Sequence, residues 1–207
     1  MTAAVASQTA ELELAPEAQE LLFRSARTAN KFTDEPVSDE QLRAIYDLIK
    51  YAPTAMNQQP LRAVVVRSEE GRARLVSHLS EGNRAKTAVA PVTVILAADV
   101  NFHDELPRVF PHFPGARDLF TGDVAAREQT AKFNAALQVG YFILGVRAAG
   151  LAAGPMTGFD AEAINADFFP DGEHKVLAVV NIGRPAAEGA WFDRLPRLDF
   201  DDVVSTV

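Results

Sequence analysis

The sequence contains no cysteine among its 207 residues, and it has no long apolar run. Without cysteine the chain cannot form disulfides, attack a substrate with a thiolate, or bind zinc or iron–sulfur clusters through sulfur. The longest apolar stretch, residues 88–98, is interrupted by Pro91 and is too short to span a bilayer. These absences predict a protein that does not cross a membrane and whose chemistry needs no sulfur ligand.

Common nucleotide-binding and catalytic signatures are also missing. The sequence has no G-x-G-x-x-G after a strand, no G-x-x-x-x-G-K-[ST], and no G-x-S-x-G nucleophile motif. The four histidines, at positions 78, 103, 112 and 174, lack the i, i+2 or i, i+4 spacing of metal ligands. We therefore expect neither a metal site nor a phosphate-binding glycine loop.

Positive charge is scarce as well. The chain has 28 acidic against 20 basic residues, which gives a formal net charge of −8. Nucleic acids and anionic membranes are bound by concentrated positive fields, so neither is an expected partner. An anionic ligand would require a few arginines or lysines gathered locally. The first 20 residues lack the basic segment of a signal peptide, and we expect a cytoplasmic protein.

Apolar periodicity and capping signals predict one α+β domain over residues 1–207, with residues 1–15 as a flexible arm. Ser38 and Gln41 form a capping-box pattern before a helix whose apolar stripe is Leu42, Ile45, Leu48 and Ile49. The expected elements are helices at 16–27, 38–52, 71–79 and 124–149, strands at 63–66, 92–97 and 176–183, a packed aromatic excursion at 101–122, a connector at 151–160 ending in the helix cap Asp160, and an extended tail after 184. The alanines and glycines of the 124–149 helix suit a central or dimer-interface helix.

Two groups of polar residues are candidates for a binding site. Thr54, Asn57, Gln58 and Gln59 donate and accept hydrogen bonds without charge, which suits a planar heterocycle, although an ordinary loop has the same composition. Arg24, Arg27 and Lys31 alternate with Ser25, Thr28 and Asn30, a combination that suits a phosphate. The alternative for this second group is a solvated basic face beside a turn.

Five segments in order along the chain carry a family resemblance: ARTANKF (26–32), YAPTAMNQQP (51–60), GNRAK (82–86), AAGPMTGFD (152–160) and RLPRL (194–198). In sequence and spacing they resemble the FMN-dependent nitroreductase family, over nearly the whole chain. Within the family the chain is similar to the malonic semialdehyde reductase branch, also described as a 3-hydroxypropionate dehydrogenase of the Rut pyrimidine-degradation pathway. The resemblance implies an α+β nitroreductase-like fold, with a mixed or antiparallel sheet among helices, and an intertwined homodimer that binds FMN between its subunits.

The resemblance also implies roles for particular residues. Arg27, Thr28, Asn30 and Arg197 would lie at the FMN phosphate, although Arg24 could replace Arg27 there. Asn83 and Lys86 would bond the polar edge of the isoalloxazine ring, and Pro155, Met156, Thr157 and Gly158 would line one of its faces. The partner chain would contribute Thr54, Asn57 and Gln59. This chain departs from the family at Thr157, where many members have an acid, and at Asn30, where many have a base.

The implied activity is an NAD(P)H-dependent reduction through the flavin, with no protein nucleophile. A malonic semialdehyde acceptor would give 3-hydroxypropionate, and its carboxylate would need a cation. Arg117 is the preferred candidate for that cation, with Arg108 and His112 as alternatives in the same excursion. A broad nitro- or quinone reductase and a flavin-binding sensor without turnover remain alternatives, and the choice between NADH and NADPH stays open.

Overall fold

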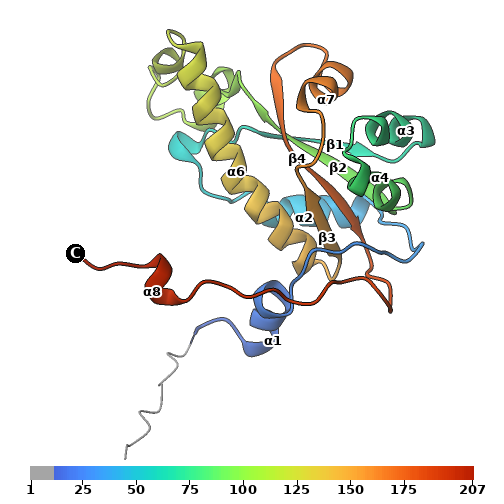
Figure 1. The fold of residues 1–207 in the computed structure, drawn as a ribbon. Helices are drawn as coiled ribbons and strands as arrows, with labels where there is room; N and C mark the ends of the chain where they lie inside the picture. Colours follow the sequence, from blue (N-terminus) through green and yellow to red (C-terminus); the bar gives the residue numbers. More distant parts are fainter. Residues whose placement is uncertain (1–11) are drawn as a thin grey trace, which may run out of the picture.

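The computed structural model describes residues 12–207, so most of the predicted flexible arm lies outside the described residues. Its centre is an antiparallel sheet with strand order β1-β2-β4-β3. The strands are β1 (Leu61–Val66), β2 (Val92–Asp99), β3 (Ala152–Met156) and β4 (His174–Gly183). Helices surround this sheet (Figure 1), which confirms the predicted α+β class and settles the sheet as antiparallel rather than mixed.

The α-helices are α1 (Pro16–Gln19), α2 (Asp39–Ile49), α3 (Glu69–Ser77), α4 (Glu81–Ala88), α5 (Leu106–Val109), α6 (Val124–Ala148), α7 (Ala161–Phe168) and α8 (Phe200–Val203). A π-helical turn, η1 (Glu20–Arg24), follows α1, and three 3₁₀ turns are η2 (Ala55–Asn57), η3 (Phe102–Glu105) and η4 (Arg117–Phe120). Within residues 12–207 no helix is both long and apolar enough to cross a membrane.

Strand β2 shows why the sheet is the core of the molecule. Seven of its eight residues are buried, because helices cover both faces. Val92, Val94 and Leu96 belong to one apolar cluster with α2 and α6, whereas Ile95 and Ala97 belong to a second cluster with α3 and α7. This alternation follows from the period of two along a strand, and it confirms the predicted central strand.

The predicted caps are confirmed. Ser38 and Gln41 exchange hydrogen bonds of 2.9 and 3.2 Å in a capping box, and Asp160 caps α7 by accepting from the backbone of Ala163. One position of the predicted stripe is wrong, since Leu48 is 59% exposed while Ile45 and Ile49 are buried. The helix predicted over residues 16–27 is also shorter, because helical geometry ends at Arg24.

The segment predicted as a connector at 151–160 contains the edge strand β3. Pro155 has no N–H for a ladder, and an edge strand tolerates that loss because only one side is paired. Gly154 is required by packing, because a Cβ there would lie 2.5 Å from the carbonyl oxygen of Ala29. Proline and glycine in this strand therefore reflect its position in the sheet rather than a turn.

The 101–122 excursion is packed, as predicted, and the structure shows that its partner is the N-terminal half of α6. Phe102 is fully buried and its ring meets that of Phe120 at a centroid distance of 5.0 Å, whereas Phe113 is exposed. The tail is not extended throughout, since α8 interrupts it; Figure 1 shows α8 lying away from the sheet.

Candidate functional site

The end of β3 and the loop after it lie against α4. Asn83 donates a hydrogen bond of 2.9 Å from Nδ2 to the carbonyl oxygen of Gly158, and the backbone N–H of Ser80 donates to the same oxygen at 3.0 Å. A Cβ at Gly158 would lie only 2.7 Å from Asn83 Nδ2, so the absence of a side chain permits this approach. The predicted residues Asn83 and Gly158 are thus in direct contact.

Lys86 joins this group from the same helix. It is half-buried, and its Nζ lies 3.5 Å from Oδ1 of Asn30. The chain around Asn30 is fixed on β3, because the backbone N–H of Ala29 donates to the carbonyl of Ala153 at 3.0 Å. The tertiary structure therefore brings predicted residues from three distant segments together beside the end of β3.

A cavity of about 340 Å³ lies next to this group, between residues 26–30 and the tail. Its lining comprises Ala26, Arg27, Thr28, Asn30, Phe192, Asp193, Arg194, Leu195 and Arg197. Arg27 donates to the carbonyl of Phe192 at 3.2 Å, and Arg194 donates to the carbonyl of Ala26 at 3.0 Å. We call this cavity the arginine pocket.

The arginines of the arginine pocket donate hydrogen bonds to backbone carbonyl oxygens. Within residues 12–207, Arg27, Arg194 and Arg197 form no ion pair. Arg24 differs, because it pairs with Glu20 at 3.6 Å and donates to Gln19 at 2.6 Å, and it does not line the pocket. Of these two arginines, only Arg27 lines the arginine pocket.

Sequence reasoning missed a further arginine nearby. Arg147 is half-buried near the end of α6 and shares a cavity of about 210 Å³ with Arg27 and Trp191. Burial, followed by the positive charge of Arg194, lowers the pKa of Arg147. A basic residue in the last turn of a helix is common, so no sequence signal distinguished it.

Thr54, Asn57 and Gln59, from the first predicted group, lie around η2. Met56, Asn57 and Gln59 have positive φ angles of 50°, 52° and 46°, an unusual backbone for residues other than glycine. Asn57 Nδ2 donates to the carbonyl of Val109 at 2.8 Å, and Thr54 Oγ1 accepts from the backbone of Gln59 at 3.2 Å. In one chain this loop lies away from α4, on the other side of α6 (Figure 1).

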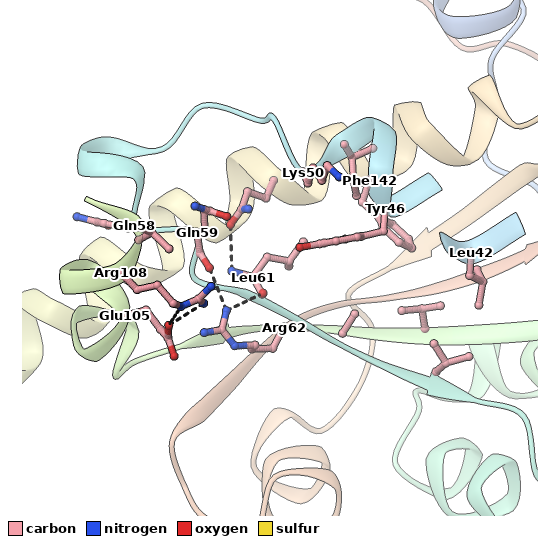
Figure 2. A pocket seen from close by; sticks show the side chains of 16 residues that line it. Leu42, Tyr46, Lys50, Gln58, Gln59, Leu61, Arg62, Glu105, Arg108 and Phe142 are labelled. Atoms are coloured by element: carbon pink, nitrogen blue, oxygen red, sulfur yellow. Dashed lines mark hydrogen bonds and ion pairs between the residues drawn. The ribbon is translucent and has the colours of Figure 1, made fainter. Parts of the chain in front are cut away.

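A larger cavity, of about 560 Å³, lies between α2, β1 and α5 rather than at the arginine pocket. Figure 2 shows Arg62, Glu105 and Arg108 at one end of it and Leu42 and Tyr46 at the other. The cations of this cavity are paired: Arg62 with Asp99, Arg108 with Glu105 and Lys50 with Asp47, each at 2.7 Å. Of the predicted cofactor ligands only Gln59 lines it, so size alone does not make it the anion site.

The residues of the 101–122 excursion that were predicted to bind the substrate carboxylate contact other side chains of the chain. Arg117 is held by Asp104, with Nε and Nη2 at 2.8 and 2.7 Å from Oδ1. His112 is exposed, and its ring lies 3.9 Å from that of Phe110 between centroids. Neither residue lines the arginine pocket.

Comparison with known proteins supports one assignment. The sequence profile described as "Nitroreductase family" matches residues 23–184. A Streptomyces griseus protein named "Putative NADH dehydrogenase/NAD(P)H nitroreductase" is 64% identical over 95% of this chain and 99% of its own length. A protein of the same name from Leptothrix cholodnii is 49% identical, over 87% and 91% of the two chains. These relatives are not named as malonic semialdehyde reductases, so the predicted branch is not established.

Solved structures agree in fold. A "Nitroreductase Family Protein" from Streptococcus pneumoniae superposes with a TM-score of 0.76 at 19% identity, covering 92% of this chain and 98% of its own. A "putative nitroreductase in complex with FMN" from Exiguobacterium sibiricum gives a TM-score of 0.80 at 20% identity, covering 93% and 98%. At such identities the likeness concerns the fold alone, whereas the profile match and the close relatives decide the family. The chain belongs to the nitroreductase family.

Proposed function

We propose that this chain is an NAD(P)H-dependent FMN reductase acting on nitro or quinone acceptors, with one FMN-binding domain per chain. The observation that carries the proposal is the arginine pocket beside the β3–α4 contact, where cations without carboxylate partners among residues 12–207 meet neutral amides. A phosphate at one end and a polar ring edge at the other would satisfy both kinds of group. The names of the close relatives and the FMN complex of a structural neighbour support the same assignment.

The residues present fit FMN. Arg27, Thr28, Asn30 and Arg197 would hold the phosphate, because charge-assisted bonds from guanidinium groups suit it. Asn83 and Lys86 would bond the ring edge, and residues 155–158 would cover one face. FMN, when bound, supplies hydride transfer at its N5 atom. The half-buried Lys86 would hold negative charge at the ring edge during reduction.

A second copy of the chain completes the proposed site. Thr54, Asn57 and Gln59 lie away from α4 within one chain, so they would reach a flavin only from another subunit. Apolar side chains are exposed on α6 and along the tail, which favours a homodimer that buries them. They are Phe133, Leu137 and Tyr141 on α6 and Phe192, Leu195, Leu198 and Phe200 on the tail.

Malonic semialdehyde is placed second among acceptors. Its carboxylate needs an available cation, and both arginines proposed for it are paired, Arg117 with Asp104 and Arg108 with Glu105. The test is steady-state NADH and NADPH oxidation by purified protein with nitrofurazone, menadione or malonic semialdehyde. Faster turnover with nitrofurazone or menadione is expected. Turnover only with malonic semialdehyde would reverse the order.

Two further measurements test the cofactor and the assembly. A yellow preparation with flavin absorbance and a mass in solution of two chains are expected. A colourless protein that does not take up added FMN would contradict the proposal, and flavin binding without NAD(P)H oxidation would indicate a sensor.

A further inference from the structure

Three polar side chains are completely buried between the sheet and α4. They are Thr93 on β2, Asn181 on β4 and Thr87 on α4, each with 0% of its surface exposed. Thr93 Oγ1 donates to Asn181 Oδ1 at 2.8 Å, and Asn181 Nδ2 donates to Thr87 Oγ1 at 3.0 Å. The Thr87 hydroxyl then donates to Met156 Sδ at 3.7 Å. The four side chains form one hydrogen-bonded chain, which we call the buried relay.

All hydrogen bonds of the buried relay run from donor to acceptor in the same direction, from Thr93 to Met156. Both threonine hydroxyls and the Asn181 amide each donate one hydrogen bond, and Asn181 Oδ1 and Thr87 Oγ1 each accept one. In a low-dielectric interior such linked bonds polarise one another, and removing one member leaves a buried group without its partner. The sheet does not need the relay for its register, because Thr93 and Asn181 are also paired through the backbone ladder.

The part of the relay near α4 adjoins the proposed flavin site. Thr87 directly follows Lys86, and its carbonyl accepts from Arg72 at 3.0 Å, so this turn of α4 is held from two sides. Met156 is the last residue of β3 and precedes Thr157 and Gly158. A methionine side chain has three rotatable bonds, and a hydrogen bond from the Thr87 hydroxyl to the sulfur restricts the conformation of Met156.

We propose that Thr87, anchored on Asn181, is a positioning residue that fixes Lys86 and Met156 relative to each other, and thereby sets the affinity and the redox behaviour of the flavin. The inference rests on the proposed function, since it assigns the relay a role in FMN binding. Thr93 has no such role, because its only side-chain bond in the relay is to Asn181, at the end far from α4.

The test compares Thr87→Val with Thr93→Val, two substitutions of the same shape. Each leaves one buried atom of Asn181 unpaired, so the melting temperature of both variants should fall by a similar amount, about 2–12 °C. Only Thr87→Val also frees Met156 and the turn that carries Lys86. We expect the FMN dissociation constant to rise about tenfold and the flavin midpoint potential to shift in Thr87→Val, with both values near wild type in Thr93→Val. Thr87→Ser keeps the hydroxyl, so its FMN dissociation constant and flavin midpoint potential should stay near the wild-type values.

The outcomes separate the two proposals. Equal FMN affinity and equal potential in the two valine variants would overturn the positioning role while leaving the proposed function intact. Wild-type protein that binds no FMN would overturn the proposed function itself. If Thr87→Val does not fold, Met156→Leu keeps the Asn181–Thr87 bond and removes the sulfur acceptor of the Thr87 hydroxyl. An unchanged FMN affinity and potential in Met156→Leu would then also overturn the inference, and a shift in both is expected.

Discussion

Gly154→Ala tests the close approach that holds residues 26–30 on β3. An added Cβ would lie 2.5 Å from the carbonyl oxygen of Ala29, a backbone atom that cannot rotate away. Carbon and oxygen atoms settle at about 3.3 Å or more, so the segment would have to move by about 0.8 Å. The hydrogen bond from Ala29 N to Ala153 O, now 3.0 Å, would then lengthen beyond a normal bond.

The cost follows from these two effects. Overpacking costs about 1–3 kcal/mol, and a lost backbone hydrogen bond costs about 0.5–1.5 kcal/mol. For a chain of this size each kcal/mol lowers the melting temperature by about 2–4 °C, so a fall of about 3–18 °C is expected. Because Arg27 and Asn30 move with the segment, we also expect FMN to bind at least about tenfold more weakly, equivalent to one lost charge-assisted bond.

The assay is thermal unfolding together with an FMN titration of the apoprotein. Gly122→Ala is the matched control, since a Cβ at Gly122 meets no atom within 4 Å. Equal melting temperatures and equal FMN affinities in the two alanine variants would show that the close approach at Gly154 is not required. A loss of stability in Gly154→Ala with unchanged FMN affinity would separate the packing argument, which would stand, from the site assignment, which would not.

Three further changes test other parts of the account. Lys86→Met should raise the FMN dissociation constant about 10- to 100-fold, because a half-buried charged donor is lost; unchanged binding in the same titration would remove Lys86 from the site. Arg27→Ala should weaken FMN binding about tenfold, while Arg24→Ala, whose guanidinium pairs with Glu20, should change it less than about twofold. The guanidinium of Arg74, hydrogen-bonded to Asp167, lowers the pKa of that carboxyl, so the pair stabilises the fold above the unfolded pKa of about 3.9 and the contribution is lost as pH falls further. Urea unfolding of Arg74→Ala should therefore show a lower free energy of unfolding than wild type at pH 7, and the difference should shrink at pH 3; an equal difference at both pH values would contradict it.

Features of the fold that depend on local chemistry were predictable from the sequence. The Ser38 capping box needs only residues three apart, and the Asp160 cap is equally local. The buried run of β2 is long enough to indicate a strand covered on both faces. β3 was not predictable in this way, because its proline and glycine oppose strand formation and only pairing with β4 overrides them.

For the candidate site, the sequence by itself determined which residue types are present and, through the order of five motifs, the family to which they belong. Only the tertiary structure decided which of them meet. It brings Asn30 to Lys86 and Asn83 to Gly158, selects Arg27 over Arg24 for the arginine pocket, and joins Thr87, Thr93 and Asn181 in the buried relay. The physical reason is that these contacts join residues 56 to 94 positions apart, and packing of the whole chain, rather than local propensity, determines such long-range contacts.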